Sequence, residues 1–320
     1  MRLLFITSNQ LGDAILSTGV LAHYLCEYPG ADVTVVCGKV PAPLFRAMPG
    51  IAEIIPVEKQ KYATHWLEAF GHLFGRRWDL MVDLRLVALM KLLPAKRRVF
   101  GKEASRTKHR LEDFADLLDT PGHVPSPTIW LDREVVEKAR TLIPDGGPVI
   151  GVGPVTGPLR KIWRPERYAA VLGALIAYSG IAPGARIAVF GAPNERERAE
   201  DVIKLLSSDH VIDLVGATDP LEAAAALGRC SLYLGADSGL MHLAAAMDIP
   251  TVGLFGEDGV PQVYRPWGAK TAYVHRRNPD LVADDKPSAM DSISVDEVLK
   301  VCETLLQRVG SSESDVAGPA

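Results

Sequence analysis

A short motif in the second half of the chain combines groups that can bind an anion. Asp237, Ser238 and Gly239 follow an apolar run that ends at Leu234, and a helical pattern begins directly after them. Backbone N–H groups at a helix start lack partners within the helix and attract phosphate. His242 follows Ser238 by four residues, so both lie on one helix face. The motif therefore predicts a phosphate site and points to a nucleotide ligand. A plain strand–turn–helix with a buried His242 is the alternative.

A carboxylate near the N-terminus could act as a base. Asp13 ends the polar turn that begins at Ser8, after the first apolar run, and stands at the start of a helical pattern. At the carboxyl end of a strand, a carboxylate is placed to accept a proton from a substrate. An aspartate in this position is also a common helix N-cap, so both interpretations stay open.

Two further turns after apolar runs carry polar groups. Thr156 lies in the glycine-rich turn 151–157, and Lys161 follows it, where a cation could hold a pyrophosphate. The glycine spacing does not match a dinucleotide fingerprint, and a solvated basic loop is the alternative. Glu195 falls in the first turn of a later helix. There it could bind ribose hydroxyls or simply be stabilised by the helix dipole.

Positive charge gathers between Lys91 and Arg110, where Glu103 is the one acid, although the whole chain has a formal net charge of −4. Such a stretch suits an anionic or phosphorylated partner, or a lipid headgroup surface. A solvated surface is the alternative. The negative overall charge argues against a general nucleic-acid binder. The sequence contains no phosphate loop, HExxH, CxxC or Asp-x-Asp motif, and thus predicts no bound metal.

The elements that position these residues alternate between strand-length apolar runs and helical patterns, which implies parallel sheets covered by helices. Residues 121–127 are the best candidate linker. We predict an α/β protein with two doubly wound domains, 1–125 and 126–308, facing a central cleft, and a flexible tail, 309–320. The predicted strands are Leu3–Thr7, Val33–Cys37, Glu53–Val57, Leu80–Leu84, Arg98–Gly101, Val149–Val152, Arg186–Phe190, Val211–Leu214, Ser231–Leu234 and Thr251–Phe255. The predicted helices include Ala14–Glu27, Tyr62–Phe74, Asp132–Leu142 and Asp296–Val309.

Bulk properties indicate a globular cytoplasmic protein. The chain has 320 residues, of which 48% are hydrophobic, enough to build two cores. No apolar segment is long enough to span a membrane. The four cysteines form no close pair and are expected to be buried thiols in a reducing compartment. Attachment to a membrane surface stays open.

Several of these segments together resemble a known family. Asp237–Ala246 resembles an Asp-Thr/Ser-Gly-x-x-His-Leu-Ala-Ala-Ala signature, and Pro250–Gly256 after it also matches. Leu11–Thr18 is similar to a Gly-Asp loop, and Lys161–Trp163 to a Lys-x-Trp element. These are motifs of the bacterial heptosyltransferases, glycosyltransferase family 9, which move heptose from ADP-heptose to the inner core of lipopolysaccharide. Arg164 departs from the pattern, because the family more often has proline directly after the tryptophan.

The resemblance implies a GT-B fold with two Rossmann-like domains, the first binding the acceptor and the second the donor. It implies an inverting reaction that needs neither metal nor cofactor, with Asp13 as general base and Lys161 as the second catalytic residue. Asp237 would cap the helix and hold the turn. The expected partners are a nucleotide sugar, a phosphorylated lipid A-core acceptor and, peripherally, the cytoplasmic face of the inner membrane; nucleic acid is not expected. The expected donor-binding residues are Thr156, Lys161, Glu195, Asp237, Ser238, Gly239 and His242. From the Gly-Asp loop and the basic stretch, the expected acceptor-binding residues are Gly12, Arg97, Arg98, Lys102 and Arg106.

Three other functions stay open. One is a GT-B transferase that uses a different nucleotide sugar. Another is a nucleotide-binding protein without catalysis. The third is a nicotinamide oxidoreductase, against which the glycine spacing argues.

Overall fold

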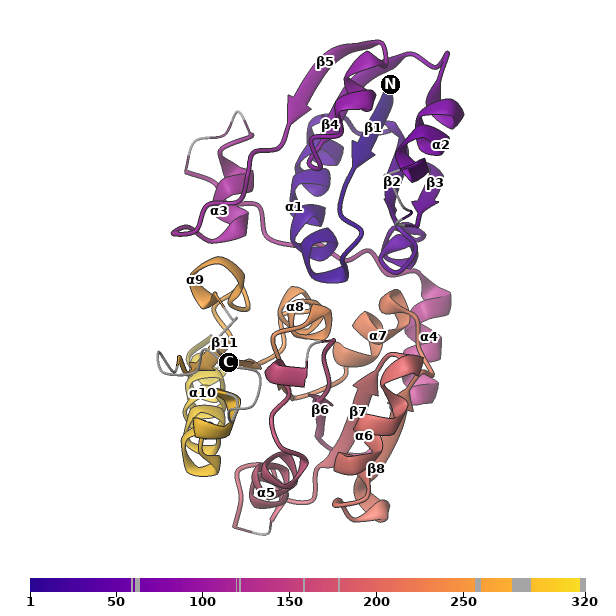
Figure 1. The fold of residues 1–320 in the computed structure, drawn as a ribbon. Coiled ribbons are helices and arrows are strands. Elements are labelled where there is room, and N and C mark those ends of the chain that lie inside the picture. The colour runs from indigo at the N-terminus through magenta and orange to yellow at the C-terminus, as the bar shows by residue number, and fades with distance from the viewer. Residues whose placement is uncertain are drawn as a thin grey trace. The chain divides into compact units, whose positions relative to one another are not determined.

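The computed structural model describes residues 1–58, 60, 64–118, 120, 122–157, 159–177, 179–256, 260–277 and 289–316. The chain forms two compact units, Met1–Asp132 and Arg133–Ala320 (Figure 1). The predicted linker therefore lies inside the N-terminal unit, apart from Pro121, which is outside the described residues. Each unit is a parallel sheet with helices, as the alternating pattern predicts.

The sheet of the N-terminal unit has the strand order β3-β2-β1-β4-β5, and all its strand pairs are parallel. The order reverses between β1 and β4, so the loops after these two strands flank the switch point at the carboxyl edge. The elements are β1 (Arg2–Ile6), α1 (Leu11–Glu27), β2 (Asp32–Gly38), η1 (Ala42–Phe45), β3 (Ile51–Val57), α2 (Thr64–Leu73), β4 (Trp78–Asp83), η3 (Ala88–Leu92), β5 (Ala95–Phe100) and α3 (Arg110–Ala115).

The sheet of the C-terminal unit has the order β11-β10-β9-β6-β7-β8, again with parallel pairs. Its switch point lies between β6 and β9. The elements are α4 (Arg133–Leu142), β6 (Val149–Gly153), η4 (Leu159–Lys161), α5 (Pro165–Ile176), β7 (Arg186–Gly191), η5 (Pro193–Glu195), α6 (Arg196–Ile203), η6 (Ser208–His210), β8 (Val211–Val215), α7 (Pro220–Leu227), β9 (Leu232–Ala236), α8 (Gly239–Ala246), β10 (Thr251–Phe255), α9 (Pro261–Tyr264), β11 (Thr271–His275), η7 (Ala289–Ser292) and α10 (Val295–Val316).

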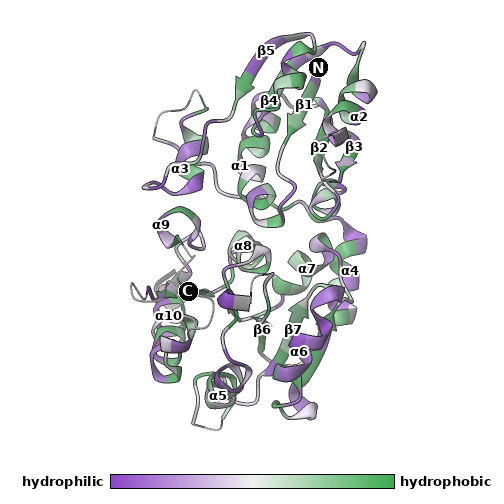
Figure 2. Cartoon of the chain, in the orientation of Figure 1, coloured by the Kyte–Doolittle hydropathy of each residue, from purple (hydrophilic) through white to green (hydrophobic). Residues whose placement is uncertain are grey.

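The central strands are buried on both faces, which explains their nearly continuous apolar sequence. Each unit has its own core, and central strands such as β1 and β7 are mostly hydrophobic in Figure 2. In the C-terminal unit, for example, Ile150 and Val152 of β6 pack in one cluster with Leu234 of β9 and Tyr168 of α5. The two cores hold the strand ends, and hence the loops that follow them, in fixed positions.

The predicted strands are all present, with ends shifted by at most about three residues, as expected for boundaries read from sequence. The edge strand β11 was not predicted. Helix α10 continues to Val316, past the predicted end at Val309, because Gly310 weakens a helix without ending it. Residues 317–320 of the predicted tail are outside the described residues.

The cysteine prediction is wrong in one case. Cys37, Cys230 and Cys302 are buried, but Cys26 is exposed near the end of α1. All four thiols are free.

Candidate functional site

The predicted phosphate motif forms a turn between β9 and α8, at the switch point of the C-terminal sheet. Ser238 is the N-cap residue of α8, in extended conformation, yet its side chain makes no capping hydrogen bond. Gly239 is the first helical residue, so no side chain at this position covers the first backbone N–H groups. The predicted strand–turn–helix is confirmed, and the helix start offers N–H donors to an anion.

Lys161 and Asp237 form an ion pair across this switch point. The Lys161 Nζ lies 2.7 Å from Asp237 Oδ2, and their side chains are only 22% and 14% exposed. The N-cap of α8 is Ser238, so the prediction that Asp237 caps the helix is wrong. Asp237 lies one residue before the N-cap, and its carboxylate accepts from Lys161 in the loop after β6. Asp237 therefore holds the turn through this ion pair. The predicted cation is thus beside the predicted phosphate turn.

The loop after β6 is held in place on both sides of Lys161. The Thr156 hydroxyl, which is buried, donates to the Asp237 carbonyl at 3.4 Å. Trp163 is fully buried, and its indole N–H donates to the Ile293 carbonyl at 3.1 Å. This anchor fixes the backbone two residues after Lys161 and explains why a tryptophan stands at this position.

His242 and Glu195 also lie on loops or helix starts that follow central strands. His242 is 5% exposed in the first turns of α8, close in sequence to Ser238. Glu195 ends η5 after β7, and its Oε2 accepts the backbone N–H of Ala192 at 2.8 Å. One carboxylate oxygen of Glu195, the residue predicted to bind the ribose, therefore stabilises the turn in which Glu195 lies.

Asp13 occupies the corresponding position in the N-terminal unit. It lies in the first turn of α1, after β1, and its Oδ2 accepts from the Ser8 hydroxyl at 3.4 Å. The N-cap of α1 is Gln10, so Asp13 does not cap the helix. The alternative interpretation of Asp13 as only an N-cap is wrong, and its carboxylate is partly exposed at the switch point.

A second carboxylate at this edge was missed in the sequence. Asp83 ends β4, next to β1, and is fully buried. Its two oxygens accept the backbone N–H groups of Arg85 and Val87, both at 2.9 Å. Burial raises the pKa of Asp83, and the two N–H groups partly oppose that shift. An aspartate at the end of an apolar run was the available signal, and its role here is to shape the loop.

Two of the predicted acceptor residues lie far from Asp13. Arg97 donates to Glu27 and to the Tyr28 hydroxyl, at 3.2 and 3.1 Å. Glu27 ends α1, which places it about 21 Å along the helix from Asp13 at ~1.5 Å per residue. Arg98 donates to the Leu93 carbonyl, before β5 begins. Both arginines therefore serve the opposite edge of the sheet.

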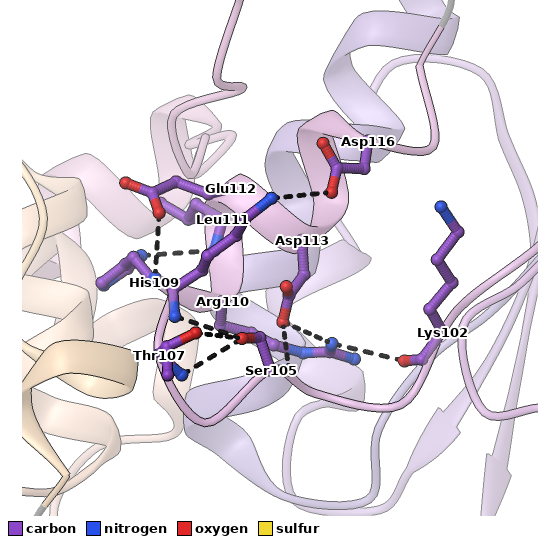
Figure 3. A network of polar contacts seen from close by, with 10 residues as sticks. Lys102, Ser105, Thr107, His109, Arg110, Leu111, Glu112, Asp113 and Asp116 are labelled. Carbon is purple, nitrogen blue, oxygen red and sulfur yellow. Dashed lines mark hydrogen bonds and ion pairs between the residues drawn. The ribbon is translucent and has the colours of Figure 1, made fainter.

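Gly12, Lys102 and Arg106 do lie at the carboxyl edge. Gly12 is in the first turn of α1, and the other two are exposed in the loop after β5. A polar network holds this loop (Figure 3). Asp113 Oδ2 accepts from the Ser105 backbone N–H at 2.9 Å and from Arg110 at 3.4 Å, and Arg110 also donates to the Lys102 carbonyl. The Lys102 side chain extends away from the network in Figure 3.

Four of the eight basic residues in the stretch 91–110, Arg97 with Glu27 among them, form ion pairs with acidic side chains outside it, so it is not the uniform positive face that the sequence suggested. Lys96 pairs with Asp79, Lys108 with Asp116, and Arg110 with Asp113. Lys102 and Arg106 are exposed, and among the described residues neither forms an ion pair. At the carboxyl edge of the sheet, a phosphorylated ligand could meet these two charges.

Neither a metal cluster nor a membrane helix is found in the part of the chain that the structure describes. No three His, Cys, Asp or Glu side chains there are arranged to hold a metal ion. None of the described helices combines the length and apolar character needed to cross a bilayer.

Comparison with known proteins agrees with this arrangement. Residues 94–293 match the family model for glycosyltransferase family 9 (heptosyltransferase). The chain is 25% identical to lipopolysaccharide heptosyltransferase 2 of Salmonella typhimurium, over 97% of this chain and 100% of that protein.

Solved structures share the fold. A family 9 glycosyltransferase of Veillonella parvula has a TM-score of 0.78 at 21% identity, covering 96% of this chain and 97% of that one. The ADP-heptose lipopolysaccharide heptosyltransferase II of E. coli has a TM-score of 0.74 at 21% identity, covering 97% and 100%. The chain belongs to glycosyltransferase family 9 and is a glycosyltransferase with two Rossmann-like sheets of the GT-B type.

Proposed function

We propose that this enzyme transfers heptose from ADP-heptose to the inner core of lipopolysaccharide. The names of its relatives support this donor and acceptor. The single observation that carries the proposal is the Lys161–Asp237 pair beside the Ser238 turn. It places a cation next to a helix start whose backbone N–H groups have no side-chain cap. Such a pair of features suits a diphosphate.

The donor half-site would stabilise the leaving group. Negative charge grows on the β-phosphate as the bond to the anomeric carbon breaks, and Lys161 with the N–H groups at Ser238 and Gly239 would bind it. Lys161 must then share its ammonium between Asp237 and the phosphate. Thr156, Glu195 and His242 complete the proposed nucleotide contacts, with Glu195 facing the ribose.

Asp13 is the proposed general base. The acceptor hydroxyl oxygen forms a bond to the anomeric carbon while the carbon–oxygen bond to the β-phosphate breaks, and the electron pair leaves with ADP. The hydroxyl proton goes to the Asp13 carboxylate, and the anomeric centre inverts. The position of Asp13 at a switch point and its freedom from a capping role support this assignment.

We assign acceptor binding to Gly12, Lys102 and Arg106. The two cations are exposed at the carboxyl edge of the N-terminal sheet, and their loop is held by Asp113. We leave Arg97 and Arg98 out because their guanidinium groups are engaged at the opposite edge. The same two cations would touch a cytoplasmic membrane surface that carries the acceptor, which makes vesicle binding sensitive to salt.

The experiment that tests the proposal is ADP release from ADP-heptose, with heptose-free lipopolysaccharide as acceptor. Release that depends on the acceptor supports the proposal, and unchanged release in EDTA supports the absence of a metal requirement. Tight ADP binding without release would instead favour another nucleotide sugar, which competition among ADP, UDP and GDP would identify. Absence of ADP binding would refute the donor site.

A further inference from the structure

Two buried hydroxyl groups meet at the start of α8, and within the described part of the chain neither makes a hydrogen bond of regular geometry. Tyr233, in β9, is fully buried, and no described residue lies in regular hydrogen-bond geometry to its hydroxyl. The Ser238 hydroxyl is buried as well, and among the described residues it too lacks a hydrogen bond of regular geometry. Buried hydroxyl groups are normally hydrogen-bonded, so two unpaired ones in one place call for an explanation.

Two glycines show where the Tyr233 hydroxyl lies. A Cβ atom on Gly153 would stand 2.2 Å from the Tyr233 Oη, and one on Gly235 would stand 2.3 Å from it. These glycines pair with each other near the carboxyl ends of β6 and β9, which is the switch point. The same Cβ on Gly153 would lie 3.3 Å from Leu240, in the first turn of α8. The phenol group therefore runs along the sheet and ends under the phosphate turn.

The two hydroxyls are neighbours. Burial raises the pKa of Tyr233, and a hydrogen-bonding contact with the Ser238 hydroxyl opposes that shift. A serine hydroxyl can donate one hydrogen bond and accept two. It can therefore donate to an anion in front of the turn while it accepts from the tyrosine behind it.

We infer that Tyr233 is a positioning residue for the diphosphate: its hydroxyl donates to Ser238 Oγ when Ser238 donates to a phosphate oxygen. The inference rests on the proposed function, because it takes the ligand to be a nucleoside diphosphate. Tyr233 touches no substrate. It fixes the direction in which the Ser238 hydroxyl proton points. Gly153 and Gly235, which have no side chains, leave room for the Tyr233 hydroxyl.

The test is titration calorimetry with ADP and with adenosine. Tyr233→Phe should weaken ADP binding about three- to tenfold, the range for one net hydrogen bond, and leave adenosine binding unchanged. Ser238→Ala should weaken ADP binding at least as much, and Tyr233→Phe added to Ser238→Ala should cause no further loss. Tyr168→Phe is the matched control. It removes another fully buried, unpaired tyrosine hydroxyl, in α5, where the ring packs against Trp163, and it should not change ADP binding.

Each other result overturns the inference. Unchanged ADP affinity in Tyr233→Phe would mean that the hydroxyl does not act on the phosphate. An equal loss for ADP and adenosine would mean a general packing effect. Additive losses in the double variant would mean that the two hydroxyls act separately. If the unaltered protein does not bind ADP, the proposed function itself fails, and that result is visible before any variant is measured.

Discussion

The Lys161–Asp237 pair should contribute measurably to the stability of the C-terminal unit. Two opposite charges 2.7 Å apart attract each other by about 1.5 kcal/mol at the permittivity of water and by about 6 kcal/mol at an effective permittivity of ~20. The side chains are 22% and 14% exposed, between these limits. Desolvation and side-chain ordering offset most of the attraction, so we expect a coupling free energy of about 1–2 kcal/mol.

A double-mutant cycle measures this coupling. Lys161→Ala, Asp237→Ala and the double variant are unfolded in urea and followed by tryptophan fluorescence, to which the buried Trp163 of the same unit contributes. The loss in the double variant should be smaller than the sum of the single losses by about 1–2 kcal/mol. The control cycle uses Arg140 and Glu137, which pair at 2.8 Å but are 58% and 53% exposed, and should show a coupling of at most ~0.5 kcal/mol.

Lys161→Ala and a further variant, Asp237→Asn, separate stability from ligand binding. Lys161→Ala should weaken ADP binding about ten- to a hundredfold, the range for a hydrogen bond to a charged group. Asp237→Asn should keep or raise ADP affinity, because it releases Lys161 for the phosphate, although it destabilises the fold. Additive stability losses within ~0.5 kcal/mol, or a loss of ADP affinity in Asp237→Asn as large as in Lys161→Ala, would refute this view of the pair.

Four further predictions concern the N-terminal unit. Asp13→Ala should lower turnover by about 10²–10⁴ with unchanged ADP affinity, and normal turnover in the release assay would rule out the base assignment. Asp83→Ala should destabilise the protein by about 1–3 kcal/mol for each backbone N–H group that it leaves unpaired, as thermal unfolding would show. The pKa of Asp83 is raised in the folded protein, so this carboxyl group also makes a pH-dependent contribution to the free energy of unfolding. That contribution is fully present below the ordinary pKa of 3.8 and is lost as the pH rises through the pKa of the folded state. Asp83→Asn should therefore flatten that part of the stability profile. Asp113→Ala should raise the acceptor KM severalfold and leave ADP affinity unchanged, because it releases the loop that carries Lys102 and Arg106; an unchanged KM would contradict the role given to that loop.

Most of the fold could be predicted because strands buried on both faces have a simple pattern. The apolar runs and the helical periodicity between them locate the predicted strands to within about three residues. The strand β11 was not predicted because Thr271–His275 is only partly buried at a sheet edge, where a continuous apolar run is not required. The end of α10 escaped because a single glycine is a weak stop signal.

The candidate site shows a similar limit. Sequence places Lys161 and Ser238 after strands, and parallel topology brings the ends of those strands to one edge. It cannot show which partner a side chain chooses. Arg97 lies in a basic stretch of the sequence, but in the fold β5 places its side chain beside the end of α1. There its guanidinium donates to Glu27. In the sequence, Tyr233 is one residue of a predicted strand. Only the structure shows that its hydroxyl lies beside Gly153 and Gly235.

The strand order of the C-terminal sheet has a consequence for synthesis of the chain. Its two central strands, β6 and β9, are separated by β7 and β8 in sequence, and Lys161 meets Asp237 across 76 positions. Contacts this distant form late, because the intervening chain must first be made and ordered. A ribosome-bound fragment that ends before β9 can hold β6, β7 and β8 yet has no place for a diphosphate. Capture of a nascent chain on immobilised nucleotide would therefore begin only once residues beyond α8 have left the ribosome, which makes nucleotide binding a marker of a nearly finished domain.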